Sequence, residues 1–257
     1  MTEDRPHLYA QIVEDLRTKI TSGALAAGAR LPSRPEIMRE YGVSNSVALK
    51  VAQILVNEGL AEARSGSGTY VRARPERRRL VRSFTLRLNA PDGIGSPFAA
   101  DVARQGHRAT WSYESRTTIA PPEIRARLQL GETSAEEDAV RTAYVFQVDG
   151  EPSELSTSWE PLAITQGTPV VLPEDGPHVG VMDRMRSIGV LIDGCTEEIQ
   201  ARLGTAEECA ILRIPPGAIV FEIARTYWSQ DRPVETADIV VSAERYSLLY
   251  GEARRAE

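Results

Sequence analysis

Small polar and basic side chains gather at two places in the first third of this 257-residue chain. One group opens a predicted helix and comprises Ser44, Asn45, Ser46 and, one turn further on, Lys50. Side chains of these types can hydrogen-bond to the edges of DNA bases, and the free amides at a helix N-terminus can hold a phosphate. The other group is Arg-Ser-Gly-Ser-Gly at 64–68, where glycine allows the positive φ values of a tight loop tip. Both groups therefore predict contacts with the phosphates and bases of a nucleic acid.

Four sequence elements must position these groups. Apolar residues from 8 to 20 recur with the spacing of an amphipathic helix. A short second helix, which Ser33 would cap, is predicted at 33–42, and a third helix at 44–59. Strand-like residues on both sides of the glycine-rich tip predict a β-hairpin over 60–71. This order of helix, short helix, tight turn, helix and hairpin is typical of a winged helix-turn-helix domain.

The charge of the chain is distributed unevenly. Its net charge is −6 and its pI about 5.3, which for a uniform chain would argue against binding a polyanion. Residues 1–82, however, contain 14 Lys and Arg against 9 Asp and Glu, a net +5. Residues 83–257 contain 16 against 27, a net −11. This asymmetry indicates a nucleic-acid-binding module joined to an acidic domain of a different kind.

The rest of the chain predicts that second domain. A charged run containing a proline at 73–82 is typical of a linker, which would separate a domain at 1–72 from one at 83–250. Beyond the linker, strand-like runs are joined through hairpin signals such as Asp149-Gly150, and helical segments lie between them. Strand pairs with intervening helices are typical of an antiparallel α+β domain. We therefore expect an α+β protein of two domains.

Several classes of protein are not expected. No apolar run reaches the ~18 residues of a membrane-spanning helix, and the polar, acidic start of the chain is unlike a secretory leader. The two cysteines, Cys195 and Cys209, fit a reducing compartment, so we expect a cytoplasmic protein without disulfides. No grouping of metal ligands or catalytic residues stands out, and His7, His107 and His178 lie in unrelated contexts. We therefore predict neither a metal, nor a cofactor, nor an enzymatic activity.

Residues 8–71 resemble the DNA-binding domain of the GntR family of bacterial repressors. The resemblance rests on five stretches whose joint order and spacing are highly specific: Leu8-Tyr9-x-Gln11-Ile12, Ser22-Gly23-x-Leu25-x-x-Gly28-x-x-Leu31-Pro32-Ser33, Tyr41-Gly42-Val43-Ser44, Glu58-Gly59-Leu60 and Gly66-x-Gly68-Thr69-Tyr70-Val71. It implies that a recognition helix starts at Ser44 and enters the major groove, and that the hairpin forms a wing whose Arg64 contacts the DNA. The residues assigned to DNA binding are Ser33, Arg34, Ser44, Asn45, Ser46, Lys50, Arg64, Ser65, Gly66, Ser67, Gly68 and Thr69.

Some positions depart from the family's pattern. The family usually has arginine at the positions of Pro35 and Asn45, and often at that of Leu49. Asparagine prefers adenine through a bidentate pair worth ~1–3 kcal/mol. We therefore expect an operator that differs from the family's commonest one. Simpler roles stay open for two residues, since Ser44 would serve as a helix cap and Lys50 as a solvated side chain.

The second domain is similar to the UTRA domain, the effector-binding module of the HutC branch of this family. The matching residues are Ser96-Pro97-Phe98-x-x-Asp101, Arg141, Asp149-Gly150-Glu151-Pro152, Ser156-x-Ser158-Trp159-x-Pro161, Arg225-Thr226-Tyr227 and Pro233-Val234-Glu235 through Arg245-Tyr246. The resemblance implies a chorismate-lyase-like antiparallel sheet with flanking helices, and a small ligand bound between the sheet and its loops. The residues assigned to the effector are Ser96, Phe98, Arg141, Ser156, Ser158, Glu235 and Tyr246.

The effector residues also have purely structural interpretations. Arg141 would fit a surface salt bridge, the two serines an ordinary strand, Glu235 a solvated edge and Tyr246 the core. A second arginine, expected two places after Arg141, is Ala143, which argues against a phosphate ligand.

Together the resemblances predict a homodimeric repressor that binds a palindromic double-stranded DNA operator under the control of a small-molecule effector. Two alternatives stay open. One is a repressor without an effector, for example one that controls a mobile element. The other is a lyase-like enzyme, which only the fold of the second domain suggests and which would turn over chorismate.

Overall fold

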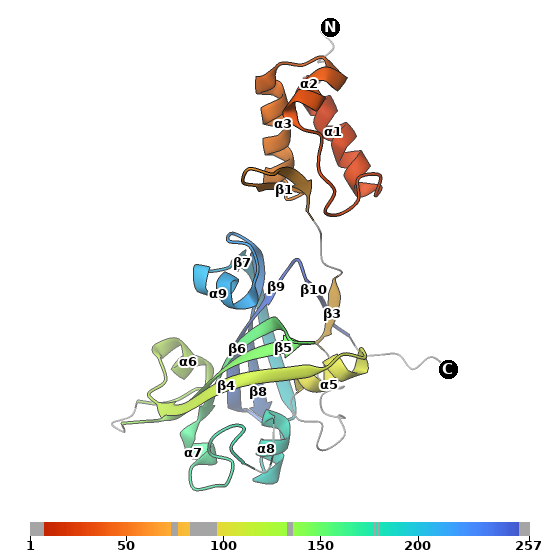
Figure 1. The fold of residues 1–257 in the computed structure, drawn as a ribbon. Coiled ribbons are helices and arrows are strands. Elements are labelled where there is room, and N and C mark those ends of the chain that lie inside the picture. The colour runs from red at the N-terminus through yellow and green to blue at the C-terminus, as the bar shows by residue number, and fades with distance from the viewer. Residues whose placement is uncertain are drawn as a thin grey trace. The chain divides into compact units, whose positions relative to one another are not determined.

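The computed structural model describes residues 8–72, 77–82, 97–132, 136–176, 178 and 180–251. The chain divides into two compact units, Met1–Pro75 and Glu76–Glu257, and each has its own hydrophobic core. Figure 1 shows the helices and hairpin of the first unit and the large sheet of the second. None of the described helices is long and apolar enough to cross a membrane.

The N-terminal unit is a winged helix-turn-helix, as predicted. Its elements are α1 (Leu8–Thr21), α2 (Arg34–Tyr41), α3 (Asn45–Asn57), β1 (Ala61–Arg64) and β2 (Gly68–Val71). The apolar stripes of the three helices meet in one core, in which Ile12, Leu16, Ile37, Val51 and Leu55 are fully buried. The turn between α2 and α3 passes through Gly42 at φ 64°, a conformation that glycine adopts without strain. The tight turn therefore fixes the angle at which α3 leaves α2.

The wing is a short antiparallel hairpin whose two strands end at Arg64 and Gly68. Its second strand also pairs with the loop that precedes α2, because the Leu31 amide donates to the Thr69 carbonyl (2.8 Å) and the Val71 amide to the Ala29 carbonyl (2.8 Å). The wing is thus attached to the helical core on one side and carries its tip freely on the other.

The C-terminal unit is built on a six-stranded antiparallel sheet, which confirms the predicted α+β class. The strand order across the sheet is β4-β5-β6-β9-β8-β7. The strands are β4 (Ala109–Thr118), β5 (Ala139–Val148), β6 (Glu151–Pro161), β7 (Gly194–Leu203), β8 (Ile219–Ser229) and β9 (Arg232–Ser242). Two tight hairpins join β5 to β6 and β8 to β9, and the first of them turns at the predicted Asp149-Gly150. Pairing of β6 with β9 then joins the two hairpins into one sheet.

In the part of this unit that the structure describes, five helices accompany the sheet: α5 (Pro97–Arg104), α6 (Pro122–Arg127), α7 (Leu162–Thr165), α8 (Val181–Ser187) and α9 (Ala206–Leu212). Because side chains alternate along a strand, the sheet has two faces. We call one the pocket face; it carries Tyr144, Ser156, Ile239 and Ile223. The opposite face carries residues such as Trp159 and Val220, which pack against α6 and α9.

The predicted linker at 73–82 is wrong for its second half. Residues Arg78–Val81 form β3, which pairs in parallel with β10 (Tyr246–Leu249) in a separate two-stranded sheet. Leu80 is only 6% exposed and packs with Ile223 and Tyr246 in the core of the C-terminal unit. Only alternate side chains of a strand need to be buried. Because arginines flank the single buried residue Leu80, the composition of this strand is that of a charged linker.

Candidate functional site

The start of α3 presents the residues predicted to read DNA. Ser44, Asn45, Ser46 and Lys50 are all exposed, and Leu49 beside them is 47% exposed although it is apolar. Ser44 stands at the cap position with extended backbone, but its side chain does not cap the helix; its Oγ lies 2.9 Å from Ser46 Oγ. The first turn of α3 therefore leaves its amides and short polar side chains available to a phosphate or a base edge.

Lys50 is held in place by an aromatic ring. Its Nζ lies 3.7 Å from the centroid of the Tyr9 ring of α1, a cation–π contact. Lys50 is exposed and at the same time contacts the ring of α1, so its ammonium is both solvated and near the start of α3.

The wing carries an arginine that already has two partners. Arg64 donates to Glu62 Oε1 from Nε (2.9 Å) and Nη2 (2.7 Å), and its guanidinium lies 4.4 Å from the centroid of the Tyr70 ring. The pair is exposed, so its strength depends on salt and its partners can be exchanged for other ions. Ser67 of the tip lies with its Oγ 2.7 Å from Tyr70 Oη. Tyr70 thus supports both the arginine and the tip of the wing.

The wing tip also depends on close approach of a second arginine. Gly68 has φ 118°, and a Cβ there would lie 3.0 Å from Nε of Arg30. Sequence analysis assigned no role to Arg30 or to Glu62, since neither stands in the wing tip or at the start of α3. Their place beside Gly68 and Arg64 adds one cation and one anion to the surface predicted to meet DNA.

Two further predicted residues lie at the start of α2. Ser33 donates from its amide (2.7 Å) and its hydroxyl (2.5 Å) to Glu36 Oε2, and these bonds hold the pKa of the Glu36 carboxyl below its usual range. The Ser33 side chain is therefore engaged within the helix start, whereas Arg34 is exposed.

The C-terminal unit contains a cavity on its pocket face. Tyr144 and Phe146 of β5, the even-numbered residues 154–160 of β6, Arg225 of β8 and Glu235 of β9 form its floor. Residues of β3, α5, α8 and the loop around Glu174 cover it. The cavity has a volume of about 80 Å³. On the same measure a single water molecule needs ~10–15 Å³. The cavity has room for a small ligand.

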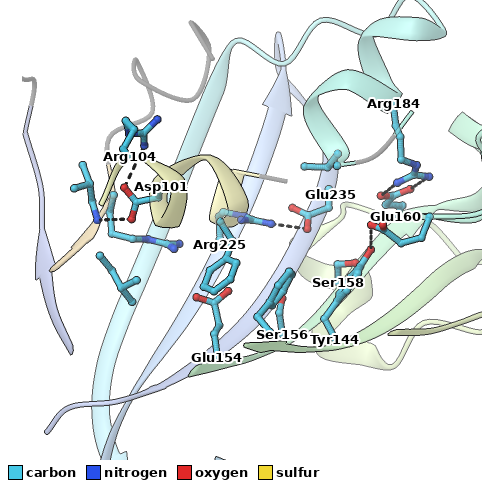
Figure 2. A pocket seen from close by; sticks show the side chains of 18 residues that line it. Asp101, Arg104, Tyr144, Glu154, Ser156, Ser158, Glu160, Arg184, Arg225 and Glu235 are labelled. Atoms are coloured by element: carbon cyan, nitrogen blue, oxygen red, sulfur yellow. Dashed lines mark hydrogen bonds and ion pairs between the residues drawn. The ribbon is translucent and has the colours of Figure 1, made fainter. Parts of the chain in front are cut away.

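Two buried ion pairs lie in this cavity (Figure 2). Arg184 of α8 forms a bidentate pair with Glu160 (2.6 and 3.0 Å) and donates from Nη2 to the Val170 carbonyl (2.6 Å). Arg225 donates from Nη2 to Glu235 Oε1 (2.8 Å). Within the described part of the chain, Arg225 Nε, Glu235 Oε2 and Arg184 Nε are buried without a hydrogen-bond partner. Burial raises the pKa of Glu235, and the Arg225 charge opposes that rise. Both pairs therefore keep spare hydrogen-bonding capacity, and the second pair keeps it on both the donor and the acceptor side.

Further charged groups surround these pairs. Arg82 pairs with Glu197, and Arg104 with Asp101 (3.1 Å). Glu174, whose backbone has φ 71°, accepts from Trp111 Nε1 (3.1 Å) and Tyr144 Oη (3.3 Å). Burial raises the pKa of the Glu174 carboxyl. The positive φ of a non-glycine residue is uncommon and here turns a carboxylate toward the cavity.

The structure brings together four of the residues predicted to bind an effector, namely Phe98, Ser156, Ser158 and Glu235. The other predictions differ. Arg141, predicted to supply charge to the effector, lies on the opposite face of the sheet, 5.8 Å from the centroid of the Trp159 ring, and does not line this cavity. Tyr246 is a core residue whose Oη lies 2.6 Å from Ser153 Oγ. Ser96 lies outside the described residues.

Sequence analysis missed the arginines that the cavity contains. Arg225 belongs to a stretch that carried the family resemblance, so its role was within reach. Arg184 had no such signal, because only the packing of α8 on the sheet brings it to Glu160. Among the residues that the structure describes, no group of three or more His, Cys, Asp and Glu could hold a metal ion.

Comparisons with known proteins agree with both units. Residues 8–71 match the family described as bacterial regulatory proteins, gntR family, and residues 104–247, more than half of the chain, match the UTRA domain. The transcriptional repressor NagR of Bacillus subtilis is 26% identical over 246 residues, which cover 95% of this chain and 93% of NagR. The histidine utilization repressor of Pseudomonas putida is 25% identical over 248 residues, covering 96% of this chain and 93% of that protein.

Solved structures extend the comparison to the fold. A crystal structure of a GntR-family transcriptional regulator is 43% identical, covers 97% of this chain and 99% of its own, and has a TM-score of 0.78. PhnF from Mycobacterium smegmatis, at 19% identity and a TM-score of 0.52, is similar in fold. From its winged helix-turn-helix and its UTRA domain, the chain belongs to the HutC branch of the GntR family of bacterial regulatory proteins.

Proposed function

We propose that this protein is a transcriptional repressor that binds a double-stranded DNA operator through α3 and the wing, and that a small molecule in the cavity modulates this binding. The observation that carries the effector half of this proposal is the cavity, in which Nε of Arg225 and Oε2 of Glu235 lack hydrogen-bond partners among the described residues. Buried polar atoms without partners are costly, so a site that keeps them is suited to a ligand that supplies the missing hydrogen bonds.

The exposed side chains at the start of α3 and on the wing have different roles in DNA binding. Asn45 and Ser46 at the start of α3 reach base edges in the major groove, and Leu49, one turn on, is available to the methyl group of a thymine. Arg64 of the wing exchanges Glu62 for a phosphate or enters the minor groove. Base contacts come from α3 and the salt-dependent contacts from the wing.

The effector acts through a dimer. Two copies place their α3 helices about one DNA turn, ~34 Å, apart on a palindromic operator in the cytoplasm. A ligand that binds the C-terminal units more tightly in one dimer arrangement shifts the population toward it. Couplings of this kind amount to ~1–3 kcal/mol, a change of ~5–150-fold in operator affinity.

Selection of bound sequences from a random DNA library tests the DNA half of the proposal. We expect a palindrome, with adenine preferred opposite Asn45 and that preference lost in Asn45→Ala. A thermal-shift screen of metabolites, followed by operator binding with each hit, tests the effector half. Ser158→Val in the cavity should abolish the response to the hit, and Arg141→Ala on the opposite face should retain it. A repressor that no metabolite affects would contradict the effector half and leave the DNA half intact.

A further inference from the structure

The arginines of the cavity are already neutralised. Among the described residues that line it, the four guanidinium groups belong to Arg82, Arg104, Arg184 and Arg225. Each pairs with a carboxylate: Glu197, Asp101, Glu160 and Glu235 respectively. An anionic ligand would have to displace one of these carboxylates, and three of the pairs lie in places where separating the partners leaves a buried charge.

Among the described residues that line the cavity, carboxylates outnumber guanidinium groups by five to four, although Nε of Arg184 and Nε of Arg225 are buried donors without a partner. Five carboxylates line it, those of Asp101, Glu154, Glu160, Glu174 and Glu235. Glu235 is 1% exposed and its Oε2 has no hydrogen-bond partner. Among the described residues, Glu174 accepts hydrogen bonds from two neutral donors, an indole and a phenol, and the charge of Arg184 acts on it only at longer range. A ligand that donates hydrogen bonds and carries positive charge would satisfy these acceptors.

Aromatic rings form part of the same lining. Phe98 of α5 lies with its ring centroid 4.7 Å from that of Phe146, and Tyr144 stacks on Phe146 at 5.2 Å. The face of an aromatic ring attracts an organic cation, and the attraction grows when water is excluded. Carboxylates and aromatic faces in one enclosed site are the combination that ammonium and guanidinium groups select.

We propose that the cavity binds a small organic cation, an ammonium or guanidinium compound, with Glu235 and Glu174 as its acceptors and Phe98 as an aromatic face. This inference rests on the proposed function, since it names the chemical class of the effector. It also separates this chain from any regulator whose effector is held by free arginines.

Matched probes of equal shape and different charge test the class. We would titrate the full-length protein by calorimetry with methylguanidinium and its neutral isostere N-methylurea, with choline and its neutral isostere neohexanol, and with inorganic phosphate, all at one ionic strength. For probes of this size we expect dissociation constants of about 1 mM or below. We expect each cation that binds to do so at least ~10-fold more tightly than its isostere, and phosphate to bind more weakly than either cation.

Variants place the bound cation in the cavity. Glu235→Gln and Glu174→Gln remove one charge each and should weaken the better cation ~10-fold. Phe98→Leu should weaken it ~3-fold. Glu151→Gln, at an exposed position of β6, is the matched control and should change nothing. Glu235→Gln leaves the buried Arg225 without its carboxylate and so also destabilises the unit, whereas Glu174→Gln and Phe98→Leu leave that pair intact and keep the test decisive.

The outcomes separate the ligand class from the function. Tighter binding of phosphate, equal binding of cation and isostere, no binding by any probe, or unchanged binding in all three variants would overturn the cation site. Cation binding that depends on Glu174 and Phe98 but leaves operator affinity unchanged at saturation would support the site and contradict the effector-controlled function. Loss of operator affinity on cation binding supports both.

Discussion

The two units of this protein use arginine in opposite ways. On the wing, the Arg64 side chain is 53% exposed and is held by one exposed carboxylate and one ring face. In the C-terminal unit, the Arg184 side chain is 2% exposed and is held by both oxygens of Glu160 and by a carbonyl. An exposed pair exchanges partners at little cost, whereas separating a buried pair leaves a desolvated charge. The first arrangement suits binding to a polyanion and the second suits a preformed site.

The largest expected effect comes from breaking the buried pair. Arg184→Met leaves the Glu160 carboxylate buried without its cation and should lower the free energy of unfolding by ~3–5 kcal/mol. Denaturant unfolding followed by tryptophan fluorescence reports on this unit, because Trp111, Trp159 and Trp228 all belong to it.

Two further variants complete this test. Arg184→Met combined with Glu160→Gln should recover part of the loss, since the orphaned charge is removed. Arg213→Met, which breaks the exposed pair with Glu151, should change the stability by at most ~1 kcal/mol. A loss no larger than that of Arg213→Met would show that burial does not distinguish the two kinds of pair.

The wing arginine should affect DNA binding and not stability. Arg64→Ala should weaken binding to all DNA sequences alike and make the slope of log affinity against log salt shallower by ~0.9, as expected for one lost phosphate contact. The slope is measured by fluorescence anisotropy over a range of salt concentrations. Arg116→Ala, at an exposed arginine of β4, should leave it unchanged. An unchanged slope in Arg64→Ala would remove Arg64 from the phosphate contacts.

Glu62 should restrain that arginine. Glu62→Gln removes the carboxylate that competes with phosphate for Arg64, so DNA binding should become tighter, by at most ~5-fold for an exposed pair of ~0.2–1 kcal/mol. Glu14→Gln in α1 makes the same change in net charge and serves as the control in the same anisotropy assay. An equal gain in both variants would attribute the effect to net charge alone.

A partly exposed group of ion pairs in the C-terminal unit should contribute no more than an exposed pair, but its contribution should depend on pH. Arg202 donates to Glu208 (2.8 and 2.7 Å) and to Glu222 (2.8 Å), and these bonds from Arg202, with those from Thr205, lower the pKa of Glu208 to about 2. In the unfolded chain a glutamate titrates near ~4.3. The stabilisation is therefore present above that pH and disappears as the pH falls through the unfolded and then the folded pKa.

Glu208→Gln measures this contribution. The variant should be less stable than the parent protein by ~0.2–1 kcal/mol at neutral pH, and the difference should shrink as the pH falls from ~5 toward 2. Tryptophan fluorescence during urea unfolding gives both values. A difference that does not change with pH would show that the amide disturbs packing and that the charge is not responsible.

Much of the N-terminal unit could be predicted because its signals are local. The stripe of α1, the glycine at the end of α2 and the glycines of the wing each act within one turn of the chain. The edge strand β7 escaped prediction because it has a neighbour on one side only and most of its side chains are exposed, so its sequence is largely polar.

The sequence by itself determined the order of elements in the N-terminal unit and the two hairpins of the sheet, β5–β6 and β8–β9, since helix caps, alternation and turn residues are short-range. Only the tertiary structure decided which side chains share the cavity. Pairing of β6 with β9 brings Ser158 of one hairpin next to the strand of Glu235 in the other, and α8 then brings Arg184 over them. Alternation places Arg141 and Ser158 on opposite faces, but long-range packing decides which face is covered to form a pocket.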